Sequence, residues 1–194
     1  MWPLRIANLL IVFGTVYTML HYYEDARVML RYFTQLSNLF SCAVSLVTLI
    51  CTFVYPTIPV WLEVLRLVAT SAVMVTFLTV LFFLAPTGGW FLLYKDDNLY
   101  LHVLGPLLAL VSFVLLERQV TISWQQALLG GIPVVLYGTV YLIQAVAKGE
   151  TKGGWTDFYG FNRGGHWRVS IVVMMTAGFA LAQLLAWVHN LLVV

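Results

Sequence analysis

Charged residues are scarce in this chain. Only 9% of its 194 residues are Asp, Glu, Lys or Arg, whereas about 25% is usual in soluble domains. Hydrophobic residues make up 61% of the chain, above the roughly 45–50% of soluble proteins. Repeated apolar runs approach the ~20 residues that a helix needs to cross a bilayer. The composition therefore excludes an ordinary soluble domain and indicates a membrane protein.

The sequence also lacks a basic stripe and a disulfide framework. Its formal net charge is +2 and is spread over the connections between apolar runs, which excludes a nucleic-acid partner. Cys42 and Cys51 are nine residues apart on one expected helix, or about 13 Å by helical rise, too far to form a disulfide with each other. No two histidines have the i, i+4 spacing of a helix-borne zinc site. We therefore expect no metal and no cofactor.

Six hydrophobic segments are long enough to cross a bilayer as helices. The connections between them are short and leave no room for a soluble domain. We therefore expect an all-α, polytopic membrane protein in which residues 1–194 form one bundle of six transmembrane helices. The expected spans are residues 3–22, 30–55, 60–85, 98–116, 124–147 and 167–189.

Positive residues are distributed unequally between the two expected sides of the membrane. Arg5, Arg66 and Arg118 fall on the side of the termini. An excess of Lys and Arg marks cytoplasmic loops, so we expect the first, third and fifth loops to face the cytoplasm. The positive residues on that side are Arg27, Arg31, Lys95, Lys148, Lys152, Arg163 and Arg168.

The second expected span carries a row of polar residues. Arg31, Thr34, Asn38, Ser41 and Ser45 are spaced three, four, three and four residues apart, so they share one helix face. Deeper hydroxyls commonly serve close helix packing, and an arginine near a helix end can extend to the headgroups. Asn38 lies too deep to reach water. We therefore expect it to face the bundle interior and find a polar partner.

Thr34 and His102 are expected at similar depth on the same side of the membrane. Each lies early in its span, and the second and fourth spans begin on the same side. Asn98 and Pro106 share the face of His102, and Pro106 is expected to leave the His102 carbonyl without its helical partner. A lone buried histidine is commonly a packing residue. An imidazole beside a hydroxyl, however, is also the minimal pairing of general base and nucleophile.

Two further elements are expected on this side. Tyr137 and Tyr141 lie on one face of the fifth span, where they belong to the interfacial aromatic belt, orient the imidazole, or line a pocket. The connection 148–168 is either an interfacial segment or a lid over a cavity. Arg163 and Arg168 either anchor the protein at the headgroups or bind a carboxylate or phosphate.

The order of polar motifs along the chain resembles that of a known family. The motifs are "RYFTQLSNL", "LHVLGPLLAL" and "DFYGFNRGGHWRV", of which the "FT..SN" element is the most specific. The chain resembles, over nearly its whole length, the small six-span proteins related to the androgen-induced membrane proteins, whose bacterial branch is called the Pr6Pr membrane proteins. The resemblance implies a multi-pass protein of a bacterial inner membrane.

The animal members of this wider family hydrolyse fatty acid esters of hydroxy fatty acids with a membrane-embedded threonine and histidine. Carried onto this sequence, the resemblance makes Thr34 the nucleophile and His102 the general base. This chain is shorter than the animal proteins, and its segment "FTQLSN" is more polar than theirs. The resemblance therefore leaves the substrate open.

These observations predict an intramembrane hydrolase of lipid esters with a fatty-acyl substrate drawn from the bilayer. Thr34 would attack the ester carbonyl, and His102 would take up and return the proton. Asn38 or Ser37 would donate to the oxyanion, and Arg31 or the two loop arginines would hold a free carboxylate. The alternatives are a transporter or lipid-binding protein that uses the same polar cavity, and a scaffold that packs its polar face on a partner. Polar groups that cluster toward one side favour the hydrolase.

Overall fold

The computed structural model describes residues 1–22 and 25–193, and this part of the chain contains helices and no strand. Six helical spans are long and apolar enough to cross a membrane, which confirms the expected all-α polytopic bundle. Every end of a span lies within three residues of its predicted position. The observed spans are Trp2–Tyr22, Phe33–Val54, Val60–Gly88, Leu99–Leu116, Trp124–Lys148 and Trp167–Leu192.

Three spans are single helices and three are divided into segments. The single helices are α1 (Trp2–Tyr22), α3 (Phe33–Val54) and α10 (Trp167–Leu192). The third span comprises α4 (Val60–Thr79), the π-helical η1 (Val80–Leu84) and α5 (Ala85–Gly88). The fourth comprises the π-helical η2 (Leu99–Leu104), α7 (Gly105–Val111) and the π-helical η3 (Ser112–Leu116). The fifth comprises α8 (Trp124–Ala127), the 3-10 helix η4 (Leu128–Gly131), α9 (Ile132–Tyr141) and the π-helical η5 (Leu142–Lys148).

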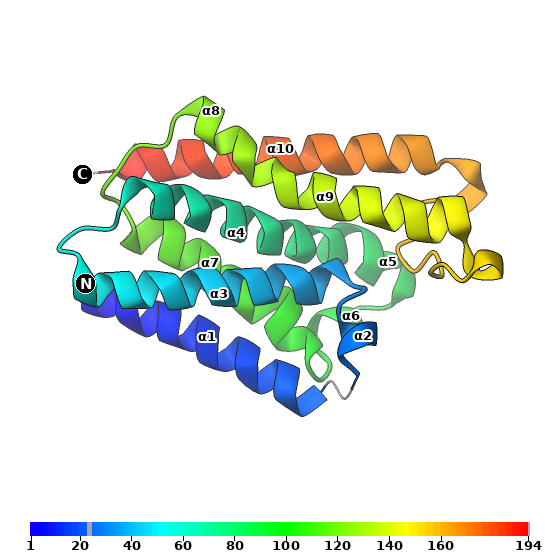
Figure 1. The fold of residues 1–194 in the computed structure, drawn as a ribbon, viewed down its shortest axis with the longest axis horizontal. Helices are drawn as coiled ribbons and strands as arrows, with labels where there is room; N and C mark the ends of the chain where they lie inside the picture. Colours follow the sequence, from blue (N-terminus) through cyan, green and yellow to red (C-terminus); the bar gives the residue numbers. More distant parts are fainter. Residues whose placement is uncertain (23–24, 194) are drawn as a thin grey trace.

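The connections between spans contain short helices. These are α2 (Ala26–Met29), α6 (Phe91–Tyr94), and the 3-10 turns η6 (Glu150–Lys152) and η7 (Arg163–Gly165). Both chain termini lie at one end of the bundle, and the connection between η5 and α10 lies at the other (Figure 1). The second, fourth and sixth spans therefore begin at the end away from the termini.

Helix α4 forms the centre of the bundle. It packs against α3, α7 and α10, while α1 lies along α3 at the edge (Figure 1). Leu67, Ala69, Ala72 and Val73 on α4 are completely buried. The outer surface is instead apolar and exposed, as at Leu20, whose exposed fraction is 80%. Such a surface suits lipid, which offers no polar partners, and would be a liability in water.

The second span begins at Phe33, so the prediction that Arg31 lies on it is wrong. The chain turns at residues 30–32, where the N–H of Arg31 donates to the carbonyl of Val28 at 3.1 Å. Tyr32 then has extended backbone angles, with φ −101° and ψ 136°, which stop the helix from continuing toward Arg31. The polar face of α3 therefore begins at Thr34, in the first turn.

Candidate active site

Thr34 and His102 lie together at the end of the bundle opposite the termini. Thr34 is in the first turn of α3 with an exposed fraction of 8%, and His102 is in η2. The Thr34 Oγ1 atom is 3.4 Å from Nε2 of His102. Catalytic hydrogen bonds are often this long before substrate binds. The structure thus brings together the two side chains that the depth argument paired.

The second ring nitrogen of His102 fixes the tautomer. His102 Nδ1 contacts the backbone carbonyl oxygen of Leu92, in α6. A carbonyl oxygen only accepts hydrogen bonds, so Nδ1 carries the hydrogen and Nε2 is left as an acceptor that faces Thr34. Carbonyl, imidazole and hydroxyl therefore follow one another in the order of a catalytic triad, with a carbonyl in place of the carboxylate.

The helix around His102 has π geometry. This geometry determines which residue's carbonyl lacks a hydrogen-bond donor because of Pro106. The N–H of Gly105 bonds to the carbonyl of Tyr100, five residues earlier. In this register the donor for the Leu101 carbonyl would be residue 106, and proline has no N–H. The prediction that Pro106 frees the His102 carbonyl is therefore wrong by one residue. The orphaned carbonyl is that of Leu101.

Asn38 satisfies this orphaned carbonyl. Its Nδ2 donates to the Leu101 carbonyl at 3.0 Å and to the Thr34 carbonyl at 2.8 Å. Asn38 thus faces the bundle interior, has a polar partner, as the sequence predicts, and links α3 to η2. Both amide hydrogens are engaged, so none remains for an oxyanion. The expected oxyanion role of Asn38 does not fit this geometry.

Ser37 also serves a structural contact. Its Oγ donates to the Thr34 carbonyl at 3.0 Å and lies 3.0 Å from Oγ1 of Thr76 on α4. Its single hydrogen is directed to the backbone of the preceding turn. Ser37 therefore holds α3 against α4 beneath Thr34, and it too is a poor oxyanion donor.

Tyr137 and Tyr141 connect the fifth span to the loops of this end. The Tyr137 hydroxyl donates to the Arg31 carbonyl at 2.7 Å, and the Tyr141 hydroxyl donates to Oδ1 of Asp157 at 2.7 Å. These contacts do not lead to His102, whose ring is oriented by the Leu92 carbonyl instead. Of the alternatives for the two tyrosines, orientation of the imidazole does not fit these contacts, whereas Tyr137 does line an apolar groove between α3, α4 and α9.

Asp157 organises the loop that follows. Its carboxylate accepts the N–H groups of Phe161 at 2.9 Å and Asn162 at 2.8 Å, besides the Tyr141 hydroxyl. Gly160 completes this turn with φ +69°, a conformation that suits glycine. The folded loop presents Tyr159, whose N–H donates to the Tyr141 hydroxyl at 3.0 Å.

Tyr159 reaches the start of α3. Its hydroxyl accepts the N–H of Phe33 at 3.0 Å, and it lies against the Thr34 side chain, with which it lines one small pocket. Burial raises the pKa of Tyr159 to about 12, although the Phe33 N–H and neighbouring hydroxyls lower it in part. The phenol therefore keeps its proton at neutral pH. The sequence motif gave no reason to select Tyr159 among the aromatic residues of this loop.

The other predicted site residues lie away from the Thr34–His102 pair. Arg31, Arg163 and Arg168 are exposed, and the Arg168 guanidinium lies 5.3 Å from the Trp167 ring centre. Asn98 is half-buried at the start of η2. In the described part of the chain, no side-chain hydrogen bond joins these four residues to Thr34 or His102. They do not form part of the observed site.

A large apolar cavity adjoins the pocket of Thr34. It has a volume of about 530 Å³ and lies between the end of the third span, the start of α10 and the loop at Tyr159. The small pocket of Thr34 shares Thr79, Leu84, Tyr159 and Met174 with it. Phe82 and Val169, at its mouth, are more than half exposed on the lipid-facing surface. The cavity therefore has the size of a small-molecule site and opens toward the bilayer.

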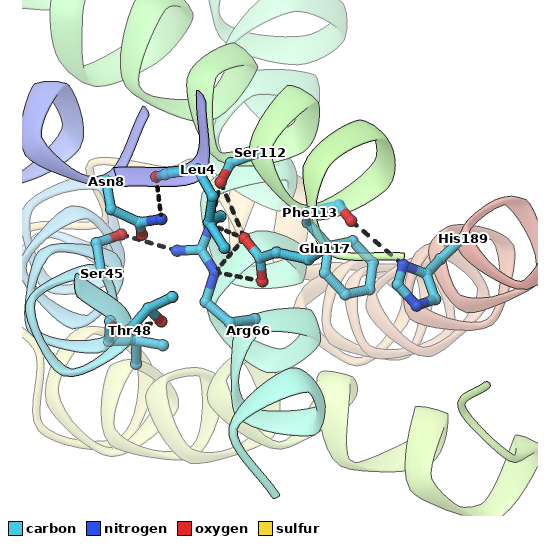
Figure 2. A network of polar contacts seen from close by, with 10 residues as sticks. Leu4, Asn8, Ser45, Thr48, Arg66, Ser112, Phe113, Glu117 and His189 are labelled. Carbon is cyan, nitrogen blue, oxygen red and sulfur yellow. Dashed lines mark hydrogen bonds and ion pairs between the residues drawn. The ribbon is translucent and has the colours of Figure 1, made fainter. Parts of the chain in front are cut away.

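A second polar cluster, which the sequence did not predict, lies at the end of the termini (Figure 2). The Arg66 and Glu117 side chains are fully buried and form an ion pair of 2.8 Å. Arg66 also donates to Ser45 Oγ at 2.7 Å and Ser112 Oγ at 2.9 Å. Glu63 and His189, 3.9 Å apart, are buried nearby. The expectation that polar groups cluster toward one side is therefore wrong.

The signal for this cluster was present in the sequence. Arg66 lies inside an apolar span, where an unpaired charge is costly, and Glu117 ends another span on the same side. Because Arg66 pairs with Glu117 inside the bundle, it does not contribute to the charge of a loop, contrary to the prediction. Of the three positive residues expected on the side of the termini, Arg5 and Arg118 then remain.

The described residues offer no cluster of three or more His, Cys, Asp or Glu side chains that could hold a metal ion. Comparisons of the chain with protein-family models, with curated proteins and with solved structures gave no match.

Proposed function

We propose that this protein is an intramembrane hydrolase of lipid esters in which Thr34 is the nucleophile and His102 the general base. The observation that carries the proposal is the alignment of the Leu92 carbonyl, the His102 ring and the Thr34 hydroxyl, with Thr34 lining the pocket beside the apolar cavity. The family resemblance of the sequence supports the same two roles. Buried hydroxyls that only support packing need no aligned imidazole.

The first half of the reaction transfers the acyl group to the protein. Thr34 Oγ1 forms a bond to the ester carbonyl carbon while His102 Nε2 takes its proton, and the carbonyl electron pair moves onto oxygen. The tetrahedral intermediate then reforms the carbonyl and breaks the bond to the leaving oxygen. That oxygen receives the proton from Nε2 and leaves as an alcohol.

The second half returns the protein to its starting state. His102 Nε2 takes a proton from water as the water oxygen attacks the acyl carbon on Thr34. The bond between the acyl carbon and Oγ1 breaks, Oγ1 regains a proton from His102, and a fatty acid leaves. The hydrogen on Nδ1 stays with the Leu92 carbonyl throughout, which holds the ring in the required tautomer.

The cavity supports a lipid as the substrate. Its lining is mostly apolar, and Phe82 and Val169 lie exposed at its lipid-facing mouth. An acyl chain moving from the bilayer into the cavity stays in an apolar environment, so chain transfer has little desolvation cost. The ester group would then meet the polar groups of Thr34 and Tyr159 at the inner end.

We also propose a bacterial inner membrane as the location, with the first, third and fifth loops in the cytoplasm. The proposal rests on the family resemblance and on the excess of Lys and Arg on that side, which is larger once Arg66 is paired inside the bundle. Glu150→Cys, in a protein whose Cys42 and Cys51 are replaced by alanine, places one thiol in the fifth loop, and it should react with an impermeant maleimide only after the cells are opened. Labelling of intact cells would reverse the orientation.

Substitution of the nucleophile tests the proposed reaction. Purified wild-type protein in detergent should hydrolyse long-chain esters of 4-methylumbelliferone, and a fluorophosphonate should label Thr34. Thr34→Ala removes the attacking oxygen, so kcat should fall by about 1000-fold or more. Thr34→Ser keeps an attacking oxygen and should retain measurable turnover.

Thr139→Ala is the matched control. Thr139 lies exposed in α9, where its hydroxyl donates to the Val135 carbonyl one turn earlier, and its loss should leave kcat unchanged. Full activity in Thr34→Ala, or fluorophosphonate labelling at another residue, would contradict the assignment of Thr34 as nucleophile.

Transport of a lipid or small molecule is the second candidate function. The observation that favours it is the position of buried polar residues along α4, from Glu63 and Arg66 at one end to Thr76 near Thr34. Intramembrane ionisable residues often mark such paths. Uptake of a fluorescent fatty acid ester into proteoliposomes by the Thr34→Ala protein would support transport, whereas release of the fatty acid by the wild type without uptake would support the hydrolase.

A further inference from the structure

Tyr159 is the polar group of the loop that meets the candidate nucleophile. It lines both the large cavity and the small pocket of Thr34, and Asp157 and Tyr141 hold its backbone in place. Its hydroxyl accepts the N–H of Phe33, the residue before Thr34. The phenol oxygen therefore sits at the positive end of the α3 dipole, where developing negative charge is stabilised.

The hydrogens around Thr34 can be assigned. The Thr34 hydroxyl hydrogen faces His102 Nε2, so the lone pairs of Thr34 Oγ1 remain for other donors. The Tyr159 oxygen uses a lone pair to accept the Phe33 N–H, so its own hydrogen remains free to donate. The neighbouring acceptors are the hydroxyl oxygens of Thr34 and Tyr137. An ester carbonyl that enters the pocket of Thr34 would offer this hydrogen a further acceptor.

We propose that Tyr159 is a catalytic residue that donates its phenolic hydrogen to the oxyanion formed when Thr34 attacks an ester. The proposal rests on the proposed hydrolase function, and it fills the role that Asn38 and Ser37 cannot take. The N–H of Phe33 polarises the phenol by donating to its oxygen, and this strengthens the phenol as a donor. The Tyr159 hydroxyl forms a stronger hydrogen bond with the negatively charged oxyanion than with the neutral ester carbonyl. This difference stabilises the transition state relative to the ground state.

A sulfur-substituted substrate separates this role from a structural one. In a thionoester the developing charge resides on sulfur, a weak hydrogen-bond acceptor, so an oxyanion donor contributes little. Tyr159→Phe should lower kcat for the oxygen ester by about 100-fold, with KM changed by less than about threefold. For the thionoester of the same acyl chain, kcat should fall by less than about threefold.

Tyr100→Phe is the matched control. Tyr100 is also a partly buried tyrosine, but its hydroxyl donates to the Ile11 carbonyl at 2.9 Å and does not line the pocket of Thr34. This variant should keep the wild-type ratio of oxygen-ester to thionoester rates. Equal losses on both substrates in Tyr159→Phe, or no loss, would overturn the role of Tyr159.

A measurement on wild-type protein tests the same role without requiring that the Tyr159→Phe variant fold. In a structure of the phosphonylated Thr34 adduct, the phosphoryl oxygen imitates the oxyanion, and the Tyr159 hydroxyl oxygen should lie about 2.5–2.7 Å from it. A phosphoryl oxygen directed away from Tyr159 would overturn the inference while leaving the hydrolase intact. Absence of hydrolysis in the wild type, or full activity in Thr34→Ala, would instead remove the proposed function itself.

Discussion

At the scale of single residues, Asn38 makes an interhelical contact that a substitution would break. Its amide is the partner of the Leu101 carbonyl, which Pro106 cannot serve. Asn38→Leu keeps a similar volume but leaves this buried carbonyl unsatisfied, which costs about 1–3 kcal/mol. We expect the free energy of unfolding, measured by SDS titration in mixed micelles, to fall by that amount.

Asn8→Leu provides the comparison for Asn38. Asn8 is also fully buried, but its Nδ2 donates to Leu4 of its own helix, and its Oδ1 has no hydrogen-bond partner among the described residues. Its replacement should cost less than Asn38→Leu because no interhelical carbonyl is orphaned. Equal costs for the two variants would contradict the role assigned to Asn38.

The sequence predicted some of these residue contacts and not others. The depth of Thr34 and His102 follows from counting residues along spans, because the bilayer fixes where each helix begins and ends. The partner of Asn38 does not follow from counting. It depends on a π turn that shifts the free carbonyl from His102 to Leu101, and backbone register is not encoded in the apolar pattern.

At the scale of elements, the loop from Trp155 to Asn162 depends on one carboxylate. Asp157 accepts the N–H groups of Phe161 and Asn162 and the hydroxyl of Tyr141, and hydrogen bonds to a charged group contribute about 1.5–3 kcal/mol each. Asp157→Ala should therefore accelerate hydrogen exchange at Phe161 and Asn162 by at least about tenfold.

Hydrogen exchange at Tyr159 should accelerate in the same variant, because its N–H donates to Tyr141 within this turn. Glu150→Ala is the control, since Glu150 is exposed in the same connection, and it should leave exchange at these amides unchanged. Unaltered protection in Asp157→Ala would show that packing of the aromatic rings, rather than the carboxylate, holds the loop.

From the sequence, this connection is expected to be either an interfacial segment or a lid. Both depend on its Trp, Tyr and Phe content, which is the same in either case. The structure shows Tyr159 inserted between the fifth span and the start of α3, an arrangement that arises from contacts between distant parts of the chain. Local composition does not encode such contacts, so the position of Tyr159 beside Thr34 could not be predicted from the sequence.

At the scale of the whole molecule, the two ends of the bundle hold different kinds of polar site. The end with Thr34 has hydroxyl and imidazole groups beside a cavity. The end with the termini has a fully buried pair of charges, Arg66 and Glu117, joined to α3 through Ser45 (Figure 2). Span positions were predictable because hydropathy alone sets them. The sequence also places Arg66 inside an apolar span, but its ion pair with Glu117 is seen only in the packed bundle.

The buried ion pair should behave as one unit in stability measurements. Arg66→Met leaves Glu117 as an uncompensated buried charge and should lower the free energy of unfolding by about 3–5 kcal/mol, and Glu117→Met should do the same to Arg66. The double variant removes both charges, so its loss should be smaller than the sum of the single losses. Arg118→Met, at an exposed neighbouring position, should cost less than about 0.5 kcal/mol. SDS titration in mixed micelles measures all four variants, and strictly additive losses would show that Arg66 and Glu117 stabilise the bundle independently.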